Sequence, residues 1–420
     1  MRRGLWTGQP ETGPGGTAQE QLMKCVLHIG TEKTATTLLQ RWVYDNEAAL
    51  SAQGVALSRV MDFPNNRKLV SFAQGGLDDY LKMRGVHDAE ARAAFFEGFA
   101  RQLADEIYEK ARDHDTFLIT SEHFHSRLLG PAQVARVREV LEPYFDEFRV
   151  ICYFREQSQK RTSLYSTGLR VSTGQTITEF QNAAGPKTHA YNYLTFFRKW
   201  EDAFGKEALV PRLFAKGALT GGDIRRDFLA HALPNVAAEA LSFETATANE
   251  ALSADEAALF QKINAARPQF IGKTLDPTPG VVKHMVEGLD FLDRSEGIYD
   301  PRQEAMYEAF NASNIAFFER YFGEARNLFE RPKAQGQDGL DAPKYSASDL
   351  AQFAERLMVL KNLVVVREEE VTLLADLANR LHSAGTISAA EAIALLSLAQ
   401  RARPGGEAIA QKIEELWSRE

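Results

Sequence analysis

The segment from Gly30 to Gln40 carries the side chains best suited to chemistry in this chain. It reads Gly-Thr-Glu-Lys-Thr-Ala-Thr-Thr-Leu-Leu-Gln, so one lysine and several threonine hydroxyls follow a single glycine. The apolar run Cys25–Ile29 precedes it and an amphipathic run containing Trp42 follows, which predicts a strand, a tight loop and a helix. The first N–H groups of a helix are unpaired and attract anions. The sequence therefore predicts a loop that holds a phosphate-like group.

A second candidate for anion binding follows the apolar run Phe148–Phe154, which predicts a strand buried on both faces. Arg155 comes directly after this run, and Ser163 follows in a predicted helix. A guanidinium group grips phosphate with two parallel hydrogen bonds, and a serine two helical turns further on can add a hydroxyl donor. The chain thus has two candidate anion-binding segments, each at a predicted strand–helix junction.

A third cluster of polar side chains follows the predicted strand Thr116–Ser121. It contains Glu122, His123 and His125. One interpretation is a cap and hydrogen-bond cluster where a helix begins. Another is a general base, which a transfer to a hydroxyl group needs close to the acceptor oxygen. A metal site is disfavoured, because no third ligand accompanies the two histidines.

The first two segments together resemble the PAPS-dependent sulfotransferases of the bacterial and carbohydrate type. Members typically read Gly-x-x-Lys-Thr-Gly-Thr-Thr-x-Leu-Gln, which this chain matches from Gly30 to Gln40 except for Ala35 in the usual glycine position. The family also places an arginine at a strand end and a serine eight residues later, as Arg155 and Ser163 are placed here. The loop does not fit a Walker A pattern, where a glycine directly precedes Lys and Ser or Thr.

The resemblance, which covers roughly residues 24–325, implies an α/β fold with a P-loop-like parallel sheet flanked by helices. It implies transfer of a sulfuryl group from PAPS to a hydroxyl, with PAP as product and a carbohydrate as acceptor. Lys33 would stabilise the charge on the leaving oxygen, and no metal is implied because a sulfuryl group carries less charge than a phosphoryl group. The implied donor site consists of Gly30, Thr31, Lys33, Thr34, Ala35, Thr36, Thr37, Arg155 and Ser163.

The resemblance also implies a general base, which family members supply as His or Glu from more than one chain position. Glu122 is the first candidate and His123 the second. Asp62, nearer the position that heparan-type relatives use, is the third. If position 35 requires a positive φ, alanine there costs on the order of 1 kcal/mol, whereas in the first turn of a helix it is harmless.

Three alternatives remain open at this point. A P-loop kinase or other phosphotransferase would need a Walker-B acid, and no Asp lies at the ends of the strands predicted near residues 121 and 154. A non-catalytic PAP-binding protein that acts through its C-terminal helices is favoured by Ala35. A sulfotransferase with a lipid or phenolic acceptor would need a long apolar pocket.

The composition fits a folded protein and disfavours broad binding to nucleic acid. The 420 residues are 44% hydrophobic, and the net charge is −8. Cys25 and Cys152 lie in predicted strands and form no disulfide framework, which indicates a reducing cytoplasm. No signal peptide or membrane-spanning run is apparent.

Four segments are predicted along the chain: a disordered tail at residues 1–21, a catalytic domain at 22–329, a linker at 330–347 and a C-terminal α-helical extension at 348–420. The last could serve in docking a partner, in forming a homo-oligomer or as a lid. Within the catalytic domain, one long helix is predicted from Asp88 to Arg112 and further helices across residues 252–323.

Overall fold

The computed structural model describes residues 23–181, 184–244, 252–266, 270–271, 274–275, 283, 286, 289, 291–332, 349, 368–403 and 405–417. The chain divides into two compact units: residues 1–257 with 294–339, and residues 258–293 with 340–420. The predicted tail and nearly all of the predicted linker lie outside the described residues. The predicted domain boundaries therefore stay predictions.

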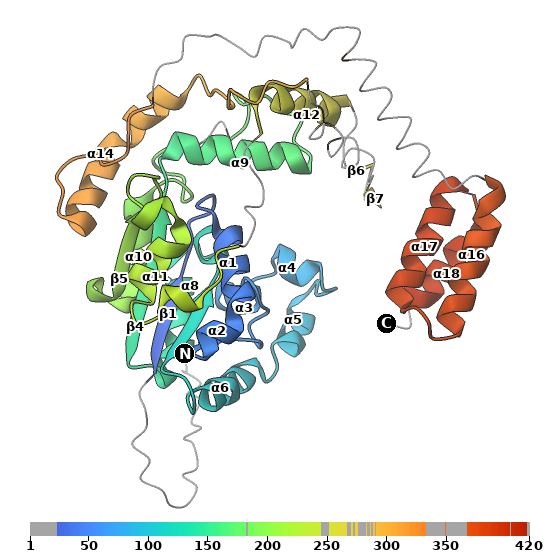
Figure 1. The fold of residues 1–420 in the computed structure, drawn as a ribbon, viewed down its shortest axis with the longest axis horizontal. Helices are drawn as coiled ribbons and strands as arrows, with labels where there is room; N and C mark the ends of the chain where they lie inside the picture. Colours follow the sequence, from blue (N-terminus) through green and yellow to red (C-terminus); the bar gives the residue numbers. More distant parts are fainter. Residues whose placement is uncertain are drawn as a thin grey trace, which may run out of the picture. The chain divides into compact units, whose positions relative to one another are not determined.

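A five-stranded, all-parallel sheet forms the centre of the first unit (Figure 1). The strand order is β2-β3-β1-β4-β5, so β1 pairs with β3 on one side and with β4 on the other. His28 at the end of β1 is in register with Thr120 of β3 and Ile151 of β4, so the strands end at one edge. The bounds are β1 Lys24–His28, β2 Val55–Leu57, β3 Thr116–Thr120, β4 Glu147–Phe154 and β5 Leu209–Leu213.

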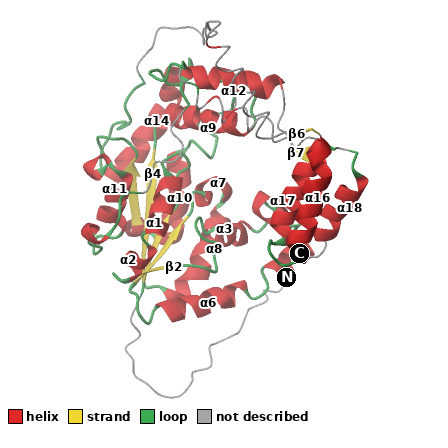
Figure 2. Ribbon diagram, turned by 45° about the vertical axis from the view of Figure 1, so that its right-hand side comes forward, coloured by secondary structure: helices red, strands yellow, loops and turns green. Residues whose placement is uncertain are grey.

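Helices cover both faces of this sheet, as Figure 2 shows with the strands in yellow. Alternate residues of β1 face opposite ways: Leu27 joins the larger apolar core with α3, α6, α8, α10 and α14, and Val26 joins a second core with α1 and α11. The α/β class with a parallel sheet flanked by helices is thus confirmed. The bounds are α1 Thr36–Asp45, α2 Glu47–Ser51, α3 Arg67–Gln74, α4 Asp79–Lys82, α7 His123–Arg127, α8 Pro131–Leu141, α9 Gln157–Val171, α10 Tyr193–Phe204, α11 Ile224–Ala232 and α14 Gln303–Phe322.

The single helix predicted from Asp88 to Arg112 is wrong. Two helices occupy this stretch, α5 (Ala89–Phe95) and α6 (Phe99–Lys110). Gly98 between them has a φ of 73°, which a continuous right-handed helix does not allow. Asp88 caps the start of α5, because its side chain accepts a hydrogen bond from Ala91 N at 2.8 Å.

The helices predicted across residues 252–323 are confirmed only in part. α12 runs over Ala254–Ala266, and Ser253 Oγ accepts from Glu256 N at 3.2 Å as a cap. A short antiparallel pair follows, β6 (Phe270–Ile271) with β7 (Thr274–Leu275). Residues 291–302 are not helical, and Gly297 forms a β-bridge with Ser253.

Three helices at the C-terminal end of the chain share an apolar core of their own. They are α16 (Glu368–Ser383), α17 (Ala389–Ala402) and α18 (Glu407–Trp417). Their core includes Val371, Ala378, Leu396 and Leu416. α17 begins at a capping box in which Ser388 Oγ and Glu391 bond reciprocally. None of the helices described here is long and apolar enough to cross a membrane.

Candidate functional site

The loop after β1 lies at the carboxyl edge of the sheet, where the chain connections reverse direction and open α/β sheets bind ligands. Gly30 has a φ of 96°, and a Cβ there would lie 3.3 Å from Glu122 Cα. Only glycine satisfies both constraints. Thr31 N donates to Tyr153 O at 2.9 Å, and Thr34 Oγ1 donates to Thr31 O at 2.7 Å. These bonds fix the loop against β4.

The threonines of this loop divide into two pairs. Thr31 Oγ1 also bonds to Tyr153 O at 3.2 Å, so the hydroxyls of Thr31 and Thr34 shape the loop itself. Thr36 and Thr37 are the first residues of α1, and the described residues make no hydrogen bond to their hydroxyls. The N-terminus of α1 with these two hydroxyls is therefore available to an anion.

Ala35 precedes α1 in the left-handed region, with φ 56° and ψ 32°. The sequence left open whether position 35 has a positive φ or lies in an ordinary first turn of the helix. The structure shows the positive φ, at which glycine is more stable than alanine. The strain of an alanine there is about 1–2 kcal/mol. Lys33 also has a positive φ, of 66°.

Arg155 joins the two candidate segments. It follows β4, and its NH1 donates to the carbonyl of Lys33 at 3.3 Å across 122 residues of sequence. Tyr193 Oη donates to the Arg155 carbonyl at 2.6 Å and so fixes its backbone. The Phe214 ring centroid lies 5.8 Å from the guanidinium carbon. Burial lowers the pKa of Arg155, but the guanidinium stays charged at neutral pH.

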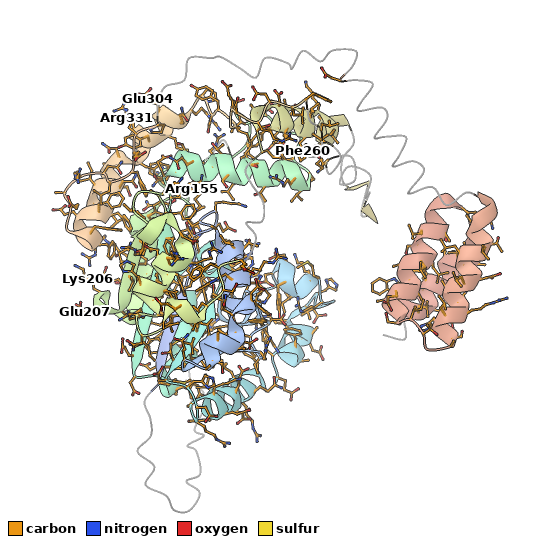
Figure 3. All side chains as sticks on the ribbon, in the orientation of Figure 1. Arg155, Lys206, Glu207, Phe260, Glu304 and Arg331 are labelled. Atoms are coloured by element: carbon orange, nitrogen blue, oxygen red, sulfur yellow. The ribbon has the colours of Figure 1, made fainter. Side chains whose placement is uncertain are left out.

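A cavity of about 160 Å³ opens beside α9, and Arg155 is one of the residues that line it. Figure 3 labels Arg155 near α9. Both members of the predicted phosphate-binding pair line it, and no carboxylate does. Four of the lining side chains carry hydroxyl groups, and sequence reasoning missed three of them, Ser158, Thr162 and Ser166. The lining residues are Arg155, Ser158, Gln159, Thr162, Ser163, Ser166, Leu252, Ile298 and Gln303.

The Lys33 side chain extends from the loop to α9, where Nζ donates to Thr167 Oγ1 at 2.5 Å. Burial lowers the pKa of Lys33, and the charges of Glu32 and Glu122 oppose that shift. In the described part of the chain, no carboxylate oxygen lies within 4.0 Å of Lys33 Nζ or of the Arg155 guanidinium. Thr167 was missed, although it lies one helical turn beyond Ser163.

Glu122 is the N-cap residue of α7, at the same edge of the sheet. Gln40 Nε2 donates to Glu122 Oε2 at 2.6 Å, and His123 Nε2 lies 3.7 Å from Glu122 Oε1. Burial lowers the pKa of His123, so its ring is neutral at pH 7. Since the charge of Glu122 acts on Lys33, the structure brings the first-choice base near the lysine.

The other polar residues singled out in the sequence lie apart from this group. Asp62 Oδ2 accepts from Tyr80 Oη and Arg84 NH2, each at 2.5 Å, and no described contact joins Asp62 to Lys33 or Glu122. His28, the last residue of β1, is fully buried and bonds Thr120 Oγ1 at 2.8 Å, which fits a structural role.

A scan against protein-family models finds no match for this chain, and searches of curated proteins and of solved structures find none either. The functional interpretation therefore depends on the geometry of the site and on the sequence motifs. The described residues contain no group of three or more His, Cys, Asp or Glu side chains arranged to hold an ion.

Proposed function

We propose that this chain is a PAPS-dependent sulfotransferase that transfers a sulfuryl group to a hydroxyl of a carbohydrate. The observation that carries the proposal is the 3.3 Å contact from Arg155 NH1 to the Lys33 carbonyl, because it brings the two candidate phosphate-binding segments together. Ser163 supports it by lining the same cavity as Arg155. The carbohydrate acceptor rests on family resemblance alone.

The charge distribution also supports an anionic ligand. Lys33 and Arg155 are partly buried cations with no carboxylate oxygen within 4.0 Å among the described residues, although Glu32 and Glu122 act on Lys33 and Glu156 acts on Arg155 from further away. A buried charge is costly unless a counter-charge compensates it. A 5′-phosphosulfate at the start of α1 and a 3′-phosphate between Arg155 and Ser163 would supply that compensation.

In the proposed reaction, the acceptor oxygen forms a bond to sulfur while the bond from sulfur to the bridging oxygen breaks. Glu122 would take the proton of the acceptor hydroxyl, and Gln40 holds its carboxylate in place. Lys33 would leave Thr167 and stabilise the negative charge that develops on the bridging oxygen. PAP departs with the bridging oxygen and its negative charge, and the proton of the acceptor stays on Glu122.

His123 is the second candidate for the base, because its ring is neutral at pH 7 and its Nδ1 is buried without a hydrogen-bond partner. Glu122→Gln and His123→Gln distinguish the two. We expect Glu122→Gln to lower kcat by about 100-fold or more, in the range found for general bases, and His123→Gln to lower it far less. The reverse order would assign the role to His123.

Thermal unfolding with PAP, ADP or ATP–Mg²⁺ at equal concentration tests the proposal. A ligand that binds only the native state raises the midpoint. We expect PAP to raise it clearly and ADP hardly at all, because ADP lacks the 3′-phosphate. Stabilisation by ATP–Mg²⁺ alone would overturn the proposal in favour of a phosphotransferase. Stabilisation by PAP without sulfuryl transfer to any sugar would overturn the carbohydrate acceptor, and failure to transfer to sugars, lipids and phenols alike would indicate a non-catalytic PAP-binding protein.

A further inference from the structure

Lys160 in α9 is a fully buried lysine whose role the proposed reaction does not explain. Its exposed fraction is 0%. Its Nζ donates to Ala190 O at 2.7 Å and lies 3.4 Å from His125 Nε2. The rings of Tyr191 and Tyr193 lie 5.6 and 5.4 Å away. No carboxylate in the described residues forms an ion pair with it, so hydrophobic packing alone would favour an apolar side chain here.

The two groups that hold the Lys160 amino group belong to segments that carry the candidate site. His125 lies in α7, which begins directly after Glu122. Ala190 lies three residues before Tyr193, whose hydroxyl holds the Arg155 carbonyl at 2.6 Å. One amino group therefore connects the segment of the candidate base with the segment that fixes Arg155.

We propose that Lys160 is a positioning residue of the anion site, which holds α7 and residues 190–193 in the arrangement that orients Glu122 and Arg155. This inference rests on the proposed function, because it takes the nucleotide site as the site that is positioned. Lys160 lines no part of the cavity and touches neither Lys33 nor Arg155 through its side chain, so it acts through its neighbours.

The hydrogen bonds around Lys160 suit a neutral amine better than an ammonium group. A neutral amine donates to Ala190 O and accepts from His125 Nε2–H. An ammonium group would force His125 Nε2 to accept, which leaves a proton on Nδ1, and that atom is buried without a partner. Burial lowers the pKa of Lys160 to about 7 and holds the pKa of His125 well below its usual range.

The groups that face this cluster come from every element packed around it. Most are basic or neutral, and Glu32 is the one carboxylate whose charge acts on Lys160. The chain of contacts continues outward: His189 Nε2 donates to His125 O at 2.8 Å, and Lys199 Nζ bonds His189 Nδ1 at 2.9 Å. The titratable groups are Glu32 of the loop after β1, His125 of α7, Cys152 of β4, His189 and Tyr191 before α10, and Tyr193 and Lys199 of α10.

The depressed pKa of Lys160 gives the proposal a pH signature. The unfolded chain keeps this lysine protonated up to about pH 10.5, whereas the folded chain releases the proton near pH 7. The unfolded state therefore binds more protons between these values, and stability rises with pH across this window. Lys199, whose pKa burial lowers to about 8, adds a rise of the same sign, so removing Lys160 should reduce the slope without abolishing it.

The test compares Lys160→Met, Lys160→Gln and the control Lys187→Met in the full-length chain. Lys187 is exposed on the same segment as Ala190. PAP affinity is measured by calorimetry from pH 6 to 9, and unfolding midpoints without ligand from pH 7 to 9.5. We expect Lys160→Met to bind PAP about tenfold more weakly at pH 8, because a tenfold change in affinity corresponds to the free energy of about one hydrogen bond. Lys160→Gln, a neutral donor, should restore most of that affinity.

We also expect both Lys160 variants to show a weaker pH dependence of PAP affinity and of midpoint than wild type and Lys187→Met. A purely structural lysine would lower the midpoint of both variants but leave PAP affinity and its pH dependence as in wild type, which would overturn the proposal. The proposal would also be overturned if Lys160→Met bound PAP with wild-type affinity and showed the wild-type pH dependence. If wild type binds no PAP at any pH, the proposed function fails, and the ligand-free slopes still decide whether Lys160 titrates as described.

Discussion

Ala35 is the residue at which this chain departs from the family motif, and its left-handed backbone makes the departure measurable. We predict that Ala35→Gly raises the free energy of unfolding by up to about 1 kcal/mol, because glycine adopts φ 56° without strain. The greater entropy of glycine in the unfolded chain offsets part of the gain. Chemical denaturation measures the change.

The matched control is Ala52→Gly, at an exposed position with a right-handed φ of −62°. Here glycine relieves no strain, and we expect a loss of about 0.4–1 kcal/mol because glycine increases the entropy of the unfolded chain. Equal effects at the two positions would contradict the strain at Ala35.

Arg155 is predicted to determine which nucleotide the site accepts. Arg155→Lys should weaken PAP binding by tenfold or more, because an ammonium group cannot form the bidentate contact of a guanidinium. Binding of ADP should change little. Calorimetry with both nucleotides measures the ratio, and Arg101→Lys, on an exposed face of α6, serves as control. An equal loss for PAP and ADP would show that Arg155 does not read the 3′-phosphate.

At the scale of the element, α9 connects the two motifs. Its Ser163 lines the cavity beside Arg155, and its Thr167, one turn further on, accepts a hydrogen bond from Lys33. Thr167 Oγ1 also donates to Ser163 O at 3.1 Å. In the absence of ligand its oxygen competes for the Lys33 amino group. We predict that Thr167→Val tightens PAP binding by up to about tenfold, because Lys33 no longer gives up a hydrogen bond to reach the ligand. Thr167→Ser should behave as wild type, and weaker binding in Thr167→Val would refute the competition.

The strands were predictable from the sequence because continuous apolar runs such as Phe148–Phe154 suit strands buried on both faces. The polar residues directly after these runs necessarily meet at one sheet edge, and the structure places Gly30, Glu122 and Arg155 there. The break at Gly98 was not predictable, because a lone glycine in a helical pattern is also compatible with an unbroken helix.

Other parts of the site depend on tertiary contacts that no local pattern records. The bond from Lys33 to Thr167 spans 134 residues, and the contact between Lys160 and His125 spans 35. The positive φ of Ala35 was not predictable either, because alanine is also a common residue in the first turn of a helix.

At the scale of the whole molecule, several buried neutral histidines predict acid lability. Burial lowers the pKa of His28 to about 3 and that of His189 to about 4. The unfolded chain protonates these rings near pH 6.5, so it binds more protons than the folded chain below that value, and stability falls as pH decreases from 6.5 towards 4. Unfolding midpoints across this range should fall more in wild type than in His28→Gln, and parallel curves would refute the role of His28.

The position of β1 in the sheet has a consequence for the synthesis of the chain. This first strand is the central one, and both of its neighbours are made much later, with His28 and its partner Thr120 92 residues apart. A ribosome adding about 5–20 residues per second leaves β1 without a neighbour for roughly 5–18 seconds. During that time its apolar side chains and unpaired backbone groups are open to other nascent chains. Expression yield should therefore respond to chaperones that bind extended apolar segments.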